Sequence, residues 1–264
     1  MKMILDKIIE TKQEEVSRLK QKTSVAQLQD IIAGLAPCRD FRNALVEDAC
    51  NIIAEVKCAS PSRGRMIISF DPVRLAQIYE KNGAAAVSVL TDEKYFMGHN
   101  EHLIKIKHHV TLPLLRKDFI LDALQVYETR AIGADAILLI ARLLGERLAE
   151  LLALAKQIGL SPLVEVHTEK ELESALTAGA EIIGINNRNL DTFATDIETA
   201  PRLKPFIPAG KIVVAESGIR RRQDIERLMD AGIRAFLIGE HLVTAADAGK
   251  KLREFKGERA NDAG

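Results

Sequence analysis

The segment AGAEIIGINNR, residues 178–188, combines the features that decide the fold. Gly179, near its start, is suited to end a helix, because the residue that follows a helix often adopts the left-handed conformation that glycine tolerates. The run IIGI that follows has no polar side chain, which is typical of a strand covered on both faces in a parallel sheet. Asn186 and Arg188 then interrupt the run at its carboxyl end. The segment therefore predicts a helix end, a buried parallel strand and polar groups where that strand stops.

The same passage from helix to strand recurs at Gly83, Gly133 and Gly232, with a spacing of about 50 residues. Each spacing holds two apolar runs, so two βα units form one repeat and four repeats predict eight strands. The predicted strands are residues 51–57, 85–91, 112–118, 135–141, 161–167, 182–188, 211–217 and 235–241. Eight parallel strands with intervening helices favour an α/β fold, a closed (βα)8 TIM barrel. An open doubly wound sheet is the alternative, although no Gly-x-Gly-x-x-Gly turn follows the first strand.

Residues 1–50 lie outside this βα repeat and are predicted to form an N-terminal helical extension that packs on the barrel. Apolar side chains recur there at helical spacing, at Ile4, Leu5, Ile8, Val16 and Leu19. Residues 25–35 are interpreted as a second short helix. No linker rich in Pro, Gly or Ser separates this extension from the rest, so it is not interpreted as an independent domain. The barrel is expected to span 51–255, and residues 256–264 are expected to be a disordered tail.

Composition narrows the class of protein and its partners. A length of 264 residues suits one barrel domain, and a formal net charge of zero offers no field to attract nucleic acid or an anionic membrane. The N-terminus lacks the uninterrupted apolar core of a signal peptide, and no stretch approaches the roughly 18 apolar residues of a membrane span. Three cysteines without a C-x-x-C pair argue against a disulfide framework or a zinc site, and the histidines between 99 and 109 have mixed spacing without a carboxylate pattern. We expect a cytoplasmic monomer or weak homodimer that uses no metal.

Polar side chains interrupt the predicted strands at their carboxyl ends. In chain order they are Glu55, Lys57, Lys117, Glu165, His167, Asn186, Arg188, Glu216 and Ser217. Side chains on a strand alternate between faces, so two residues at a spacing of two share a face. If that face points into the barrel, one ring of polar groups converges at its mouth, where barrel enzymes carry out their chemistry. Any one of these residues taken alone is equally consistent with a solvated loop position and with a functional site. Because five strands end in this way, a shared functional site is favoured.

The run LPLLRKD, residues 112–118, shows what alternation implies for charges at a strand end. Lys117 is predicted to project into the shared site, while Arg116 and Asp118 on the other face make structural pairs. An unpaired charge in an apolar setting costs several kcal/mol, so Glu55 and Lys57 should be paired, solvated in a cleft or functional. His167 and His241 also lie at strand ends, and a structural hydrogen bond is the role expected for them.

The last two predicted strand-to-helix turns indicate an anion site. They place Gly218, in SGI at 217–219, and Gly239, in IGEH at 238–241, where backbone N–H groups can hold an anion. Barrel enzymes often bind phosphate at these two loops. The loop SPSRG, residues 60–64, offers a hydroxyl and an arginine, although it is equally consistent with an ordinary turn.

With these residues assembled, the chain resembles the indole-3-glycerol phosphate synthase family. The matching motifs are IAEVKxxSPSxG (53–64), VLTDEKYFxG (89–98), LPLLRKDFI (112–120), PLVEVH (162–167), IGINNRNL (183–190), VAESGI (214–219) and FLIGE (236–240). The resemblance implies a TIM barrel with an extra N-terminal helix over the substrate side and without a second, isomerase barrel. It also implies a reaction that needs neither metal nor organic cofactor: the ring closure of 1-(2-carboxyphenylamino)-1-deoxyribulose 5-phosphate to indole-3-glycerol phosphate, with loss of carbon dioxide and water.

The resemblance also implies catalytic roles. Lys117 would protonate the ketone oxygen, and Lys57 would engage the substrate carboxylate and later donate a proton to the departing hydroxide. Glu55 and Glu165 are both candidates for the base in the dehydration. Asn186 and Ser217 would hold the ribulose hydroxyls.

Substrate-binding positions follow from the same resemblance. The residues expected to lie near the phosphate or to support the acid-base groups are Ser60, Arg188, Glu216, Gly218, Gly239 and Glu240. The residues expected around the aromatic ring are Phe96, Phe119, Leu138 and Leu190. Met66 and Ile67 make the first loop unusually apolar, and His241 stands where the family often has a small residue. Two alternatives stay open at this point, namely the preceding isomerase of the same pathway and a barrel that binds phosphorylated sugars without catalysis.

Overall fold

The computed structural model describes residues 4–61, 63–67, 69–189, 192 and 194–258. These residues form a closed barrel of parallel strands in the order β1-β10-β9-β8-β7-β6-β5-β4. The barrel strands are β1 (Asn51–Val56), β4 (Ala86–Leu90), β5 (Leu114–Lys117), β6 (Ala136–Ile140), β7 (Ser161–Val166), β8 (Ile182–Asn186), β9 (Ile212–Glu216) and β10 (Ala235–Ile238). The predicted TIM barrel is therefore confirmed, and the open sheet is excluded because β1 pairs with both β4 and β10.

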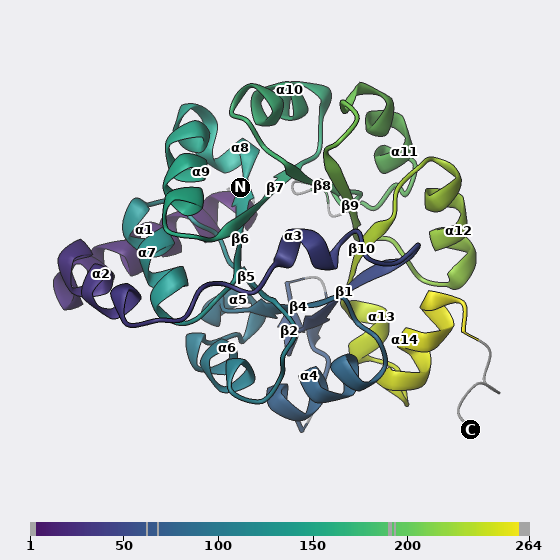
Figure 1. Ribbon diagram of the computed structural model, residues 1–264, viewed down its shortest axis with the longest axis horizontal. Helices are drawn as coiled ribbons and strands as arrows, with labels where there is room; N and C mark the ends of the chain where they lie inside the picture. The colour runs from purple at the N-terminus through teal and green to yellow at the C-terminus, as the bar shows by residue number, and fades with distance from the viewer. Residues whose placement is uncertain (1–3, 62, 68, 190–191, 193, 259–264) are drawn as a thin grey trace.

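Helices surround the barrel on the outside (Figure 1). The longer ones are α4 (Pro72–Lys81), α6 (Asn100–Lys107), α7 (Ala123–Ala131), α9 (Leu148–Gln157), α10 (Glu169–Thr177), α11 (Thr199–Leu203), α12 (Arg222–Asp230) and α14 (Ala248–Lys256). Short additional helices follow three of the strands: α5 (Glu93–Phe96), α8 (Ala141–Leu144) and α13 (Glu240–Val243). A small antiparallel pair, β2 (Ala59–Ser60) and β3 (Gly64–Arg65), forms the loop after β1.

The four predicted helix exits have the expected backbone. Gly83, Gly133, Gly179 and Gly232 have φ values of 80°, 90°, 83° and 80°, in the left-handed region. Each glycine follows the C-cap residue instead of occupying the C-cap itself, as Asn82 does for α4.

The strands end earlier than the apolar runs predicted. β8 stops at Asn186 and β10 at Ile238, whereas the predictions extended to residues 188 and 241. The polar residues beyond these ends belong to the loops at the barrel mouth, and Glu240 already begins α13.

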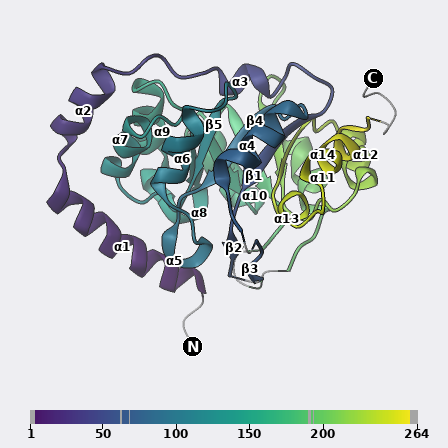
Figure 2. The same cartoon turned by 90° about the horizontal axis from the view of Figure 1, so that it is seen from below.

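The interior of the barrel is closed at its N-terminal end by a segment that the sequence did not distinguish. The short helix α3 (Phe41–Ala44) inserts Phe41, and Leu45 follows it; the two side chains are 0% and 1% exposed. They pack with strand residues that point inward, among them Ile53, Leu115 and Leu163. Figure 2 shows α3 at one end of the barrel, opposite the end that carries α5 and the β2–β3 pair.

The rest of the N-terminal extension runs along the side of the barrel. Helix α1 (Ile4–Lys22) reaches the mouth with its first turns, beside α5 (Figure 2). The predicted second helix at residues 25–35 is α2 (Val25–Ala33), which packs against α7. The division of the chain at residue 50 stays a prediction. Of the expected tail, residues 259–264 lie outside the described part. Within the described part, no helix is long and apolar enough to cross a membrane.

Candidate active site

A cavity of about 290 Å³ opens at the carboxyl ends of the barrel strands. Every predicted site residue that the structure describes lines it: Glu55, Lys57, Ser60, Phe96, Lys117, Phe119, Leu138, Glu165, Asn186, Arg188, Glu216, Ser217, Gly218, Gly239 and Glu240. Leu190 lies outside the described residues. The period-two argument put Glu55, Lys57, Lys117, Glu165, Asn186 and Arg188 on one face, and all six line the cavity, whereas His167, which it placed with Glu165, does not. The individual roles of the lining residues stay predictions.

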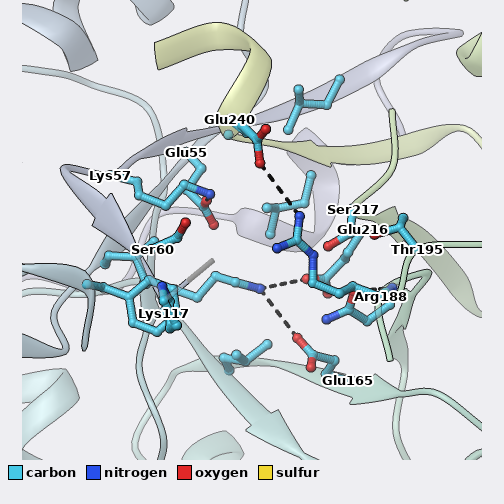
Figure 3. Close-up of a pocket in the computed structure, with 18 of the residues that line it drawn as sticks. Glu55, Lys57, Ser60, Lys117, Glu165, Arg188, Thr195, Glu216, Ser217 and Glu240 are labelled. Atoms are coloured by element: carbon cyan, nitrogen blue, oxygen red, sulfur yellow. Dashed lines mark hydrogen bonds and ion pairs between the residues drawn. The ribbon is translucent and has the colours of Figure 1, made fainter. Parts of the chain in front are cut away.

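Lys117 lies at the centre of this cavity, between two carboxylates (Figure 3). Its Nζ atom is 2.6 Å from Oε2 of Glu216 and 3.4 Å from Oε2 of Glu165. Burial opposes the charged form of Lys117, but the carboxylates of Glu216, Glu165 and Glu55 outweigh it and raise the lysine pKa. Lys117 is therefore an ammonium group across the physiological range, with a proton available to a ligand in the cavity.

The two carboxylates beside Lys117 differ in their affinity for a proton. Burial raises the pKa of Glu216 to about 7 against the attraction of Lys117, and the negative charge of Glu165 adds to this rise. Burial also opposes ionisation of Glu165, but Lys117 and His167 overcome it and hold the pKa of that carboxyl below its usual value. Oε1 of Glu216 has no hydrogen-bond partner among the described residues. The two carboxyl groups therefore titrate as one interacting pair, with pKa values that are shifted in opposite directions.

A second ion pair faces the first across the mouth. Lys57 Nζ is 2.6 Å from Oε1 of Glu55, and both side chains are largely buried. The pair fits because Gly239 has no side chain, since a Cβ atom there would lie 2.2 Å from Oε1 of Glu55. Gly184 on β8 likewise leaves room for the carboxylate of Glu216, whose Oε1 would lie 2.2 Å from an added Cβ. Glycine at these two positions is required by close approach of a carboxylate and not by backbone conformation.

Arg116 and Asp118 make structural pairs, as predicted. Arg116 lies 2.8 Å from Glu128 on α7 and 3.4 Å from Asp118. Asp118 also contacts Lys12 of α1 at 2.7 Å, which links the extension to the end of β5. One carboxylate of this network, Asp118, also borders the cavity.

One end of the cavity is rich in glycine and arginine. Ser217 and Gly218 have φ values of 64° and 80°, so the turn after β9 uses left-handed backbone at two successive residues. Glu240, at the start of α13, lies 2.7 Å from Arg63 and 3.6 Å from Arg188. Figure 3 shows Arg188 extending across the mouth toward Glu240. Guanidinium groups beside backbone N–H groups suit a phosphate.

The loops after β4 and β5, together with β6, lie across the barrel from β8 to β10 and make the cavity apolar on that side. The rings of Phe96 and Phe119 lie 6.1 Å apart at an angle of 40°, and Leu138 completes this side. Three side chains of α1, Ile4, Leu5 and Ile8, also line the cavity, and the sequence had indicated only that the extension lies on this side. Their spacing is that of ordinary core residues, so no local signal distinguished them.

Several other lining residues were missed or placed differently. Thr195 and Arg220 line the cavity and come from loops, where sequence periodicity gives no direction. Arg63, the arginine of the SPSRG loop, also lines it. His241 also lines it, whereas His167 lies outside the set of lining residues and contacts Glu165 instead.

Comparison with known proteins places this geometry in a family. Residues 5–255 match the family model described as indole-3-glycerol phosphate synthase. An indole-3-glycerol phosphate synthase of Desulforamulus reducens is 50% identical over 257 residues, with 96% of this chain and 97% of the relative covered. The enzyme of the same description from Alkaliphilus metalliredigens is 48% identical over 258 residues, with 96% and 98% covered.

Solved structures of low identity support the fold alone. A 3-hexulose-6-phosphate synthase superposes with a TM-score of 0.61 at 12% identity, covering 78% of this chain and 98% of that one. A thiamine phosphate pyrophosphorylase from Pyrococcus furiosus gives 0.59 at 14% identity, covering 79% and 94%. Because the family model spans most of the sequence and both relatives align over nearly their whole length, the chain belongs to the indole-3-glycerol phosphate synthase family.

Proposed function

We propose that the cavity binds 1-(2-carboxyphenylamino)-1-deoxyribulose 5-phosphate and closes its indole ring with Lys117 as the general acid. As a member of its family, the chain is a carboxy-lyase of tryptophan biosynthesis. The observation that carries the proposal is the position of the Lys117 ammonium group, between an apolar wall and a glycine- and arginine-rich rim in a single cavity. That order matches a substrate with an aromatic ring at one end, a ketone in the middle and a phosphate at the other.

Ring closure needs a proton at the ketone oxygen. The ring carbon that bears the carboxylate attacks the ketone carbon, and the oxygen becomes a hydroxyl as it receives a proton from Lys117. The carboxylate then leaves as carbon dioxide, and its bonding electrons restore the aromatic ring. Glu216 and Glu165 support this step, because they hold the ammonium group in place and favour its charged form.

Dehydration needs an acid and a base. We assign the acid to Lys57, which engages the substrate carboxylate first and donates a proton to the departing hydroxyl later. A carboxylate removes the proton from the adjacent carbon, and both Glu55 and Glu165 lie within the cavity for this role. Asn186 and Ser217 are proposed to hold the ribulose hydroxyls.

The phosphate is proposed to lie between Gly218, Gly239 and Ser60, with Arg188 as its charged partner. The carboxylate of Glu240 forms ion pairs with the guanidinium groups of Arg188 and Arg63. A substrate phosphate would compete with this carboxylate for the two guanidinium groups. Phe96, Phe119 and Leu138 are proposed to hold the aromatic ring by burial of apolar surface.

We further propose that the protein acts in the cytoplasm as a monomer or weak homodimer. Cys38, Cys50 and Cys58 are free thiols, which suits a reducing compartment. Among the exposed large apolar side chains of the described part, Met97 and Phe206 come from separate segments, whereas Val25 and Ile31 both lie on α2. Size-exclusion chromatography with light scattering across a concentration series tests this assignment.

The test of the reaction is the fluorescence of indoleglycerol phosphate formed without added metal. Lys117→Ala is expected to keep the fold and substrate binding. Its activation free energy should rise by roughly 3 to 5 kcal/mol, which is the scale for a lost general acid together with its electrostatic contribution. Lys170→Ala, an exposed lysine on α10, is the matched control and should turn over normally. Near-normal turnover by Lys117→Ala would defeat the assignment. Binding without any product from the wild type would favour a non-catalytic sugar-phosphate binder.

A further inference from the structure

His167 directly follows β7 and lies beside Glu165. Its Nε2 atom is 3.4 Å from Oε1 of Glu165, while the other oxygen of that carboxylate, Oε2, is 3.4 Å from Lys117. The His167 side chain is 9% exposed and does not line the cavity, so it cannot touch a bound substrate. Any influence it has on the reaction passes through Glu165.

Glu171, in the first turn of α10, fixes the histidine ring from the other side. Its Oε2 atom accepts a hydrogen bond of 2.7 Å from the backbone N–H of His167 and lies 3.1 Å from Nδ1 of the ring. An ionised carboxylate can only accept hydrogen bonds, so Nδ1 must carry a hydrogen. The tautomer and the orientation of the ring are thereby set by Glu171.

The remaining ring nitrogen determines the charge of His167. Nε2 is buried without a hydrogen-bond partner among the described residues and faces a carboxylate oxygen. A bare lone pair at Nε2 would repel that oxygen, whereas a second proton converts the contact into an ion pair. Burial opposes the imidazolium form, but Glu171 and Glu165 outweigh it and raise the pKa of His167.

The charges around Glu165 come from every side of the barrel mouth. Lys117 of β5 and His167 are the cations, Asn186 of β8 donates a hydrogen bond, and Glu216 of β9 and Glu55 of β1 are the nearby anions. With a cation against each of its two oxygens, Glu165 is held in the ionised form.

We propose that His167 is a positioning residue for the dehydration step: its imidazolium, held by Glu171, keeps Glu165 ionised so that Glu165 and not Glu55 removes the proton. The inference rests on the proposed function and selects one of the two candidate bases. It replaces the purely structural role that the sequence had indicated for His167.

The first test is the dependence of kcat/KM on pH for His167→Asn and His167→Gln. Loss of a cation raises the pKa of a neighbouring carboxylate, so the acid limb should move to higher pH by about one unit or more. At pH values well above the new limb, kcat/KM should recover to near the wild-type value, because Glu165 is ionised there without a neighbouring imidazolium. His109→Asn, which removes an exposed histidine after α6, is the matched control and should leave the limb unchanged. A uniform loss at all pH values with an unmoved limb overturns the inference.

The second test is independent of turnover. Long-range ¹H–¹⁵N NMR of the histidine rings reports the protonation of His167 in the wild-type protein, in Glu171→Gln and in Glu165→Gln. We expect both ring nitrogens of the wild type to carry protons near neutral pH, and the histidine pKa to fall in each variant. A neutral His167 in the wild type overturns the inference even if the enzyme is active, whereas a charged His167 in a protein that forms no indoleglycerol phosphate places the failure in the proposed function.

Discussion

Replacement of Lys12 tests how the N-terminal helix is held on the barrel. Lys12 is 1% exposed, and its Nζ atom lies 2.7 Å from Asp118, 2.9 Å from Asp92 and 2.7 Å from Glu15. Lys12→Met keeps an unbranched side chain, one heavy atom shorter, and removes the charge. Asp92 and Asp118 are almost wholly buried, so the variant leaves two carboxylates in an apolar setting without this cation.

The magnitude follows from the partners that remain. Removal of one member of a buried ion pair costs about 3 to 5 kcal/mol, because an uncompensated charge stays behind. Asp118 keeps Arg116 at 3.4 Å, and Asp92 keeps hydrogen bonds from the backbone N–H groups of Tyr95 and Phe96. These contacts place the expected loss at the lower end, about 3 kcal/mol of unfolding free energy.

The loss should depend on pH with a definite sign. Burial works against ionisation of Asp118, but Lys12 and Arg116 hold the pKa of that carboxyl below its usual value. A depressed pKa in the folded state gives stability that is present above the unfolded value and is lost as pH falls through the folded value. Lys12→Met raises this pKa, so the difference from the wild type should be largest near neutral pH and should shrink as the carboxylates protonate in acid.

Urea unfolding near neutral pH and in mild acid measures this difference. Lys20→Met is the matched control, since Lys20 lies on the same helix and pairs with Asp122 at 2.7 Å but is 56% exposed. An exposed pair contributes about 0 to 1 kcal/mol, so Lys20→Met should unfold nearly as the wild type does. Equal midpoints for the two variants, or a difference that grows in acid, would refute the electrostatic account of the Lys12 network.

Two further substitutions test the interior and the site separately. Phe41→Ala removes a ring that is 0% exposed at the closed end of the barrel, so the free energy of unfolding should fall by about 3 to 5 kcal/mol. The value of kcat/KM per folded molecule should stay near that of the wild type. A loss of kcat/KM without a loss of stability would contradict this. Gly184→Ala adds a Cβ atom 2.2 Å from Oε1 of Glu216, so the carboxylate must move away from Lys117 and kcat should drop by up to about 100-fold, the scale of a misplacement of about 1 Å. Gly34→Ala, at the end of α2 with its nearest contact at 3.5 Å, is the control for that change, and equal kcat in the two variants would show that Glu216 does not position Lys117.

The sequence alone was enough to predict the barrel and the face that carries the site. Repeated glycine exits and apolar runs gave the strand number, because the conformation of a helix end and the coverage of a parallel strand are local properties. Alternation along each strand then assigned Lys117 to the mouth and Arg116 to the outside, and the structure agrees. Strand ends were predicted less well, since polar residues such as Arg188 continue the pattern into a loop.

Tertiary structure alone decided which charges meet. Lys117 lies beside Glu216, at a sequence separation of 99 residues, while Lys57 pairs with Glu55, two residues before it in the sequence. The burial of Lys12 was equally invisible in the sequence. Alternation fixes only the face on which a side chain lies. The distance between side chains on different elements depends on strand register and helix packing, and these are set by contacts along the whole closed barrel.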